Sequence, residues 1–166
     1  MPNREETRNL ETIPVGPLGL IPLPSCAEIG DKINYYLVKW RKERENEHKN
    51  TLSFTGYQKD TFIMEHKLPR FGSGEGKGVI LESVRGDDLY LLVDVCNYSL
   101  TYTVAGHLNH MSPDDHFQDL KRIIAAVEGK AKRITVIMPF LYESRQHKRT
   151  ARESLDCAIA LQELIN

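Results

Sequence analysis

Residues 88–95 read DLYLLVDV, a nearly unbroken aliphatic run between two polar segments. Such a run is typical of a β-strand that is covered on both faces, because a strand with one face in water alternates apolar and polar residues. A second run of this kind, KRITVIMPFL at residues 132–141, predicts another buried strand. The shorter apolar run at residues 18–23 predicts a first strand that ends at Pro24.

Three helices are predicted around these strands, each from a start signal. Ser25 and Glu28 have the spacing of a capping box, and so do Thr150 and Glu153. Ser112, followed by a proline and two aspartates, marks the start of the middle helix. The first helix has an apolar stripe at three- and four-residue spacing, which consists of Ile29, Ile33, Tyr36, Leu37 and Trp40.

Helices and strands that alternate over short connections predict an α/β fold, with a mostly parallel sheet and helices on both faces. Residues 1–17 are expected to form a flexible tail, and residues 18–166 a single domain. Further short strands are expected at residues 52–55, 61–66 and 78–83, whereas residues 96–111 are expected to be irregular and polar. Ligands of such sheets bind beyond the C-terminal ends of the strands.

Composition narrows the functional class. The chain has 166 residues, 40% of them hydrophobic, and its 22 basic and 23 acidic residues leave a net charge of −1. This balance argues against nucleic acid as the main partner, and no apolar run is long enough to cross a membrane. The three cysteines, Cys26, Cys96 and Cys157, are expected to be reduced and mostly buried thiols of a cytoplasmic protein.

Residues 142–149, YESRQHKR, follow the last predicted strand and carry four potential cations in the five positions from Arg145 to Arg149. A cationic loop at the C-terminal end of a buried strand suits a polyphosphate, because guanidinium groups match phosphate oxygens. An ordinary solvated basic loop would have the same composition. The spacing of these residues alone leaves both interpretations open.

Residues 71–78 contain four glycines, but they lack the spacing of a phosphate-binding P-loop or of a dinucleotide fingerprint. The stretch is most simply a tight turn between strands. A second interpretation is a close backbone approach to a ligand, with Phe71 available to stack on a base. His107 and His110 lack a third ligand at a set spacing, so no metal site is predicted.

Several consecutive segments resemble one known family. Residues 70–75 (RFGSGE) and 82–88 (ESVRGDD) resemble the RFSDGE and ESVRGKD segments of ribose-phosphate pyrophosphokinases, the phosphoribosyl pyrophosphate synthetases. Residues 132–140 and 144–148 (SRQHK) resemble that family's KRITAVIPYF strand and ARQD loop. The resemblance covers about residues 18–166 and is strongest from Pro69 onward. It is greatest to a clostridial-type subgroup with an insertion at residues 39–60.

The resemblance implies the N-terminal domain of a phosphoribosyltransferase-like enzyme with two similar α/β domains. The family transfers the diphosphoryl group of ATP to ribose 5-phosphate, with Mg²⁺, to make 5-phosphoribosyl 1-diphosphate, and it forms homo-oligomers with shared active sites. The glycine-rich turn would hold adenine bound to a neighbouring subunit, and the cationic loop would contact ATP. The implied ATP-binding residues are Phe71, Ser73, Glu75, Arg145 and Gln146, with possible phosphate contacts from His147 and Lys148.

Two positions depart from the family pattern, since Ser73 and His147 stand where the family has acidic residues. The family's metal-binding histidine, catalytic lysine–arginine loop and VDD signature have no match in these 166 residues, so no catalytic or metal-ligating residue is assigned. The chain by itself is therefore expected to be inactive as a synthetase and to lack the second domain. Two alternatives remain: a non-catalytic, synthetase-associated regulatory or assembly protein, and a stand-alone nucleotide-binding module.

Overall fold

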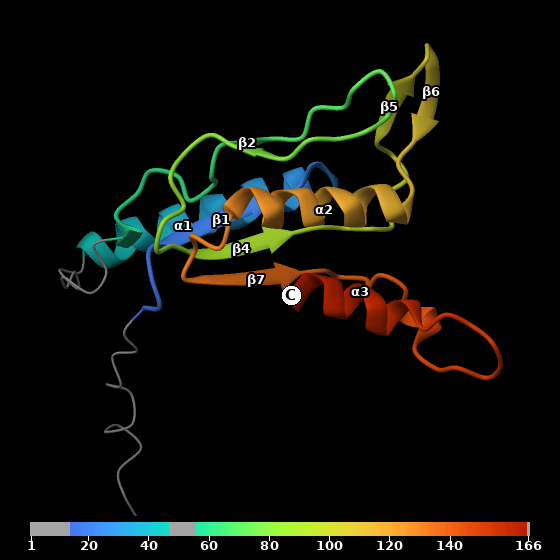
Figure 1. The fold of residues 1–166 in the computed structure, drawn as a ribbon. Coiled ribbons are helices and arrows are strands. Elements are labelled where there is room, and N and C mark those ends of the chain that lie inside the picture. The colour runs from blue at the N-terminus through green and yellow to red at the C-terminus, as the bar shows by residue number, and fades with distance from the viewer. Residues whose placement is uncertain (1–13, 47–55, 166) are drawn as a thin grey trace, which may run out of the picture.

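A computed structural model of the protein describes residues 14–46 and 56–165 (Figure 1). Residues 1–13 of the tail predicted at residues 1–17, and the predicted strand at residues 52–55, lie outside the described residues. The elements are, in chain order, β1 (Leu18–Pro22), the 3₁₀ turn η2 (Pro24–Cys26), α1 (Ala27–Asn46), β2 (His66–Lys67), β3 (Val79–Ile80), β4 (Asp88–Leu92), β5 (Thr101–Val104), β6 (His107–His110), α2 (Pro113–Val127), β7 (Arg133–Ile137), the 3₁₀ turn η4 (Ser144–Gln146) and α3 (Asp156–Ile165).

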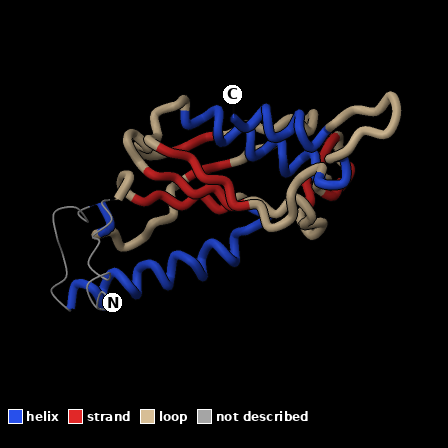
Figure 2. Tube along the Cα trace, turned by 90° about the horizontal axis from the view of Figure 1, so that it is seen from below, coloured by secondary structure: helices blue, strands red, loops and turns tan. Residues whose placement is uncertain are grey.

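The main sheet has three parallel strands in the order β1-β4-β7, with Leu20 opposite Tyr90 and Tyr90 opposite Thr135. The predicted parallel α/β architecture is confirmed. The central strand β4 is buried on both faces, because Leu89 and Leu91 point to one side and Leu92 to the other, all at most 2% exposed. Helix α1 covers one face of the sheet, and α2 and α3 cover the other (Figure 2).

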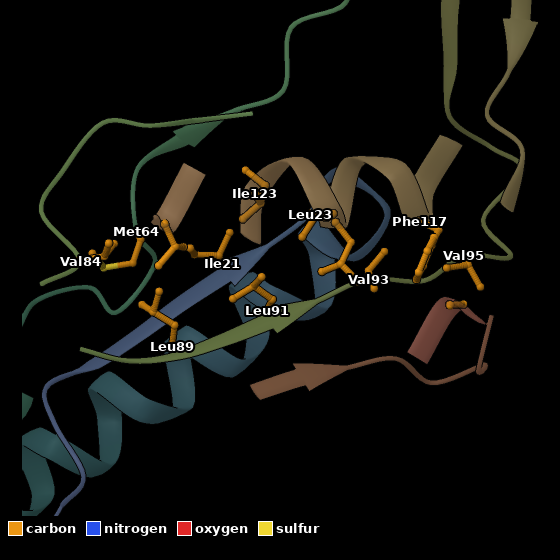
Figure 3. Close-up of a cluster of buried hydrophobic side chains, with 13 residues drawn as sticks. Ile21, Leu23, Met64, Val84, Leu89, Leu91, Val93, Val95, Phe117 and Ile123 are labelled. Atoms are coloured by element: carbon orange, nitrogen blue, oxygen red, sulfur yellow. The ribbon is translucent and has the colours of Figure 1, made fainter. Parts of the chain in front are cut away.

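The larger core lies between the sheet and α2 (Figure 3). Ile21, Leu91 and Val93 come from β1 and from β4 with the residue after it, and Phe117 and Ile123 come from α2. All five are at most 6% exposed. Burial of such side chains contributes about 1.5–3 kcal/mol each. This core therefore fixes α2 against β4 and holds the loops at the C-terminal ends of the strands.

Helix α1 buries a face that differs in part from the one predicted. Ile33 and Leu37 pack on the sheet, but Ile29, Tyr36 and Trp40 are 50%, 49% and 59% exposed, so the predicted stripe is half wrong. The helix approaches the sheet through Gly30, where a Cβ atom would lie 2.4 Å from Pro22 Cβ. This close approach turns the buried face toward Gly30 and leaves the neighbouring aromatic side chains in solvent.

The helix starts are only partly as predicted. Ser112 accepts a hydrogen bond from the Asp115 N–H at 3.1 Å and forms a capping box with that residue, which confirms the start of α2. The Ser25 hydroxyl instead accepts from the Asp94 N–H at 3.0 Å, because Ser25 belongs to η2. Thr150 donates to Glu153 at 3.0 Å, but α3 begins only at Asp156. The first predicted start therefore lies within two residues of the start of α1 at Ala27, although its cap is not formed, whereas the start predicted at Thr150 is wrong.

The predictions for the strands and for residues 96–111 need four corrections. The predicted strand at residues 61–66 is reduced to a parallel bridge between Ile63 and Leu20 and to the start of β2. The predicted strand at residues 78–83 is reduced to β3, which pairs with β2. Residues 96–111 are not wholly irregular, since they form the antiparallel β5–β6 hairpin. Strand β7 lies at one side of the sheet, so its residues are half-buried or exposed and not fully covered.

Candidate functional site

A cavity of about 300 Å³ lies at the C-terminal end of the sheet, where the loops after β4 and β7 meet the start of α2. These are two of the loops at which the parallel topology places a ligand site. Nonpolar walls come from both loops, and one guanidinium group borders the cavity. The lining residues are Val95, Cys96, Tyr98, Pro113, Phe140, Tyr142, Glu143, Ser144 and Arg145.

Tyr142 fixes the base of the cationic loop. Its ring stacks on Phe117 of α2, and its hydroxyl donates a hydrogen bond to Asp114 at 2.8 Å. Burial, together with the hydrogen bond to this carboxylate, raises the pKa of Tyr142 above its ordinary value. The phenol is therefore neutral and hydrogen-bonded across the neutral pH range, and it ties the loop to the helix.

The loop beyond Tyr142 presents cations to solvent. Glu143 has a φ of 55°, a left-handed conformation that is uncommon for a residue with a side chain, and its carbonyl accepts from the Gln146 N–H at 2.8 Å. Arg145, Lys148 and Arg149 are exposed and have no side-chain hydrogen bond or ion pair to any described residue. These three positive charges are thus available for an anion.

The remaining two predicted loop residues are less open. Gln146 is half-buried within η4. The His147 ring is exposed, but its Nδ1 lies 2.8 Å from the Ser144 carbonyl oxygen. A hydrogen bond there directs Nδ1 to the backbone and leaves Nε2 facing solvent.

The glycine-rich stretch is the tight turn predicted from the sequence. The Phe71 N–H donates to the Glu75 carbonyl at 2.8 Å, and the Gly74 N–H donates to the Phe71 carbonyl at 2.9 Å. Gly74 has a φ of 93°, which glycine adopts without a steric penalty. The Phe71 side chain is 54% exposed at the tip. The Ser73 hydroxyl donates to the Glu75 carboxylate at 2.8 Å.

A buried ionic network, which the sequence analysis did not identify, holds this turn. Arg70 donates to the Gly74 carbonyl at 3.1 Å and to the Asp119 carboxylate at 2.9 Å, while Arg122 donates to the other oxygen of Asp119 at 2.6 Å. The Asp119 side chain is only 5% exposed. Asp115 lies 3.5 Å from Arg70 at the same helix face. The four-residue spacing of the two aspartates was the available signal, since it places both on one side of a helix.

Asp115 is held ionised by its surroundings. Burial by itself would raise its pKa, but hydrogen bonds from the Ser112 backbone and hydroxyl, and the nearby Arg70 guanidinium, outweigh burial and lower the pKa below the ordinary value. A charged Asp115 at the first turn also interacts favourably with the helix dipole. The start of α2 and the glycine-rich turn are therefore joined through one carboxylate.

The two predicted groups do not meet within one chain. In Figure 1 the glycine-rich turn lies beside the β5–β6 hairpin, above α2, whereas the loop with Arg145 lies below α2, next to α3. Among the described residues, no contact joins Phe71, Ser73 or Glu75 to the cationic loop. The structure brings together the members of each group, but it keeps the two groups apart.

Within residues 14–46 and 56–165, no three His, Cys, Asp or Glu side chains are placed to hold a metal ion. His107 and His110 are exposed on β6, where His110 Nδ1 lies 2.8 Å from the Tyr98 carbonyl oxygen. Cys26 and Cys157 are buried free thiols, and Cys96 is an exposed one. None of the helices in residues 14–46 and 56–165 is both long and apolar enough for a membrane span.

The fold of this chain is similar to that of a solved protein structure. No curated protein matches the chain. Among solved structures, the crystal structure of phosphoribosylpyrophosphate synthetase from Mycobacterium smegmatis is similar, with a TM-score of 0.59 and 23% sequence identity. The match covers 89% of this chain and 38% of that chain, so this protein spans well under half the length of its structural relative. At this identity the likeness concerns the fold.

The family comparison is more specific. The model for the N-terminal domain of ribose phosphate pyrophosphokinase matches residues 20–166. The match therefore includes the parallel sheet, the glycine-rich turn and the cationic loop. Because it extends over nearly the whole sequence, the chain belongs to the family of the N-terminal domain of ribose phosphate pyrophosphokinase.

Proposed function

We propose that this chain supplies the ATP-contacting part of a ribose-phosphate diphosphokinase, which transfers the diphosphoryl group of ATP to ribose 5-phosphate for nucleotide biosynthesis. The observation that carries the proposal is the set of three exposed cations in the loop after β7, which pair with no side chain in the described part of the chain and lie beside a cavity at the strand ends. Membership of the family supports the same reaction class. Arg145 borders the cavity and is the residue best placed to meet a triphosphate.

The roles proposed for the individual residues follow their chemistry. Arg145 and Lys148 offset the negative charge of the triphosphate, with Gln146 and His147 as further hydrogen-bonding groups of the same loop. In the turn, exposed Phe71 offers a stacking surface for adenine, and Glu75 with Ser73 offers an acceptor for the amino group of the base.

The two groups act in different subunits in this proposal. The turn and the loop lie apart within one chain, so one nucleotide can contact both only when a second copy contributes the other group. Ile29, Tyr36 and Trp40 of α1, and Phe140 after β7, are apolar side chains exposed to at least 44%. Exposed apolar surface of this kind supports self-association. Sedimentation of the 166-residue chain as a clean monomer at high concentration would contradict this part.

Mg²⁺ is proposed to enter with ATP. The described residues do not fit a protein-built cage for the ion, since no three suitable side chains gather there. Mg²⁺ commonly binds through substrate phosphates with few protein ligands. We assign no step of the reaction to the metal within this chain, and the cytoplasmic location expected from the sequence remains part of the proposal.

The test is calorimetric titration of the 166-residue chain with ATP and Mg²⁺. Weak, saturable binding is expected, and replacement of both Arg145 and Lys148 by alanine should weaken it at least about tenfold, since charge-assisted hydrogen bonds contribute about 1.5–3 kcal/mol. Lys132→Ala is the matched control, because Lys132 is an exposed cation at the opposite end of β7. No heat at millimolar ATP would contradict the proposal, as would equal losses in the loop variant and the control.

Synthetase activity of the 166-residue chain by itself is not expected, because it spans only 38% of the solved synthetase. Formation of 5-phosphoribosyl 1-diphosphate by the purified chain would contradict this expectation.

One observation favours a second candidate, a non-catalytic protein that associates with a synthetase. At both positions that depart from the family pattern the side chain is engaged within the protein, Ser73 with Glu75 and His147 with the Ser144 carbonyl. Such a protein would bind a synthetase without turnover of its own. Ser73→Asp, which restores the family's acidic residue in the turn, separates the candidates: stronger ATP binding favours the enzyme part, and unchanged ATP binding with retained association with a synthetase favours the regulator.

A further inference from the structure

The β5–β6 hairpin packs against the glycine-rich turn and lies outside every site assigned above. Tyr102 of β5 lies under the Arg70 guanidinium, 4.6 Å from carbon to ring centroid. Its hydroxyl lies 3.4 Å from both carboxylate oxygens of Asp115. Tyr102 thus contacts Arg70, which holds the glycine-rich turn, and also Asp115 of α2, which lies beside Arg70.

The hairpin backbone makes a second contact with the turn. The Ala105 N–H donates to the Gly72 carbonyl at 3.3 Å. At Gly74, a Cβ atom would lie 2.9 Å from Val104 and 3.6 Å from Tyr102, so the turn packs closely on β5. If the hairpin moved away from the glycine-rich turn, the hydrogen bond and the packing contacts would be lost together. In Figure 1 the hairpin and the turn form one projection at the end of α2.

We propose that Tyr102 is a positioning residue that holds the Phe71–Glu75 turn in its nucleotide-binding geometry. The proposal rests on the proposed function of the turn, because only that function gives the geometry a ligand. Tyr102 itself lies beneath the turn and is half-buried, whereas Phe71 and Glu75 at the tip are exposed. Tyr102 acts by orientation: its aromatic ring attracts the guanidinium of Arg70 that lies over it, and Arg70 transmits this constraint to the Gly74 carbonyl.

Fluorine nuclear magnetic resonance on the full 166-residue chain labelled with fluorophenylalanine provides a ligand-independent test. The chain has five phenylalanines, and Phe71→Leu identifies the Phe71 resonance. Tyr102→Ala is expected to shift or broaden that resonance while those of buried Phe62 and Phe117 stay in place. An unchanged Phe71 resonance would overturn the proposal, because a turn held by Tyr102 cannot keep its environment without it.

Two further variants keep the test decisive. Leu108→Ala is the control on the same hairpin, since Leu108 is 69% exposed, and it should leave Phe71 unchanged. If Tyr102→Ala disturbs the resonances of the buried phenylalanines, Tyr102→Leu replaces it, because this variant keeps a nonpolar side chain but removes both the ring under Arg70 and the hydroxyl near Asp115. A Phe71 shift with the buried resonances fixed then supports the proposal, and no Phe71 shift overturns it.

Titration with ATP and Mg²⁺ adds the functional readout. Tyr102→Ala should weaken binding about fivefold, which corresponds to the energy of one such contact. If the unsubstituted chain binds no ATP but Phe71 responds to Tyr102→Ala, the proposed function fails and the positioning role stands. If the chain binds ATP, and Tyr102→Ala changes neither binding nor the Phe71 resonance, the positioning role fails by itself.

Discussion

The ring of Tyr142 lies nearly flat on the ring of Phe117, with 4.2 Å between the centroids and 10° between the planes. Phe117 is a core residue of α2, and Tyr142 is the first residue of the cationic loop. The Tyr142 hydroxyl adds a hydrogen bond to Asp114 in the first turn of the same helix. The position of the loop therefore depends on a contact between two elements that lie far apart in the sequence.

Tyr142→Ala should lower the free energy of unfolding by about 2 kcal/mol, because it removes both the stacked ring and the buried surface. Tyr142→Phe keeps the stack and should cost less than about 1.5 kcal/mol, the contribution of a typical hydrogen bond. Urea unfolding measures both values. The 61%-exposed Tyr98 is the control, and Tyr98→Ala should change little. Equal losses at Tyr98 and Tyr142 would show that the stack does not stabilise the fold.

Among the charged residues around the glycine-rich turn, Asp119 should cause the largest loss of folding stability when it is replaced by alanine. Asp119→Ala leaves Arg70 and Arg122 without their shared carboxylate in a largely buried position, and loss of one partner of a buried pair costs about 3–5 kcal/mol. The control is Glu163→Ala, which breaks the more exposed pair with Lys121 and should cost less than about 1 kcal/mol. Thermal or urea unfolding measures the loss of stability in the two variants. A cost at Asp119 no larger than that at Glu163 would contradict the role of the network.

Acid should destabilise the chain partly through Asp115. The pKa of this carboxyl is lowered in the folded state, so its contribution to stability is complete above its unfolded pKa of about 3.9 and is lost as the pH falls through the folded value. Ser112→Ala removes the hydroxyl that interacts with Asp115 and should reduce this acid dependence. Unfolding in denaturant at a series of pH values below about 5 measures the slope. An unchanged slope in Ser112→Ala would argue against this assignment.

Thiol labelling reports on the cavity at the strand ends. Cys96 lines this cavity and is exposed, whereas Cys26 and Cys157 are buried, and burial, with the nearby Asp94 carboxylate, raises the pKa of Cys26. A thiol-reactive probe should modify Cys96 first in the native protein and all three cysteines in denaturant. ATP with Mg²⁺ should slow the native reaction if the triphosphate lies beside Arg145.

Cys96→Ser is the control for this assignment, and it should abolish the fast native phase. Equal rates with and without saturating ATP would place the nucleotide away from this cavity.

Local patterns predicted those parts of the fold whose cause is local. The aliphatic run at residues 88–95 predicted β4 because a strand buried on both faces has few polar residues, and Ser112 predicted α2 because the cap residue, the proline and the two aspartates that mark a helix start follow one another directly. The tight turn at residues 71–78 followed from its glycines. The residues assigned to ATP stay predictions, although the structure places them in two compact groups.

The remaining features depend on contacts between distant segments. Ser25 had a capping pattern, but its hydroxyl accepts from the Asp94 N–H, 69 residues away. The exposed side of α1 was set by the approach of Gly30 to Pro22, which no helical period encodes.

By itself, the amino-acid sequence determined the parallel α/β class and the family, because hydrophobic runs and consecutive motifs are properties of neighbouring residues. Only the tertiary structure decided that the β5–β6 hairpin supports the turn through Tyr102 and that Asp119 joins two arginines. It also decided that the turn and the cationic loop lie on different sides of α2 (Figure 1). The physical reason is that burial and charge pairing are fixed by which segments meet in space, and that depends on the packing of the whole core.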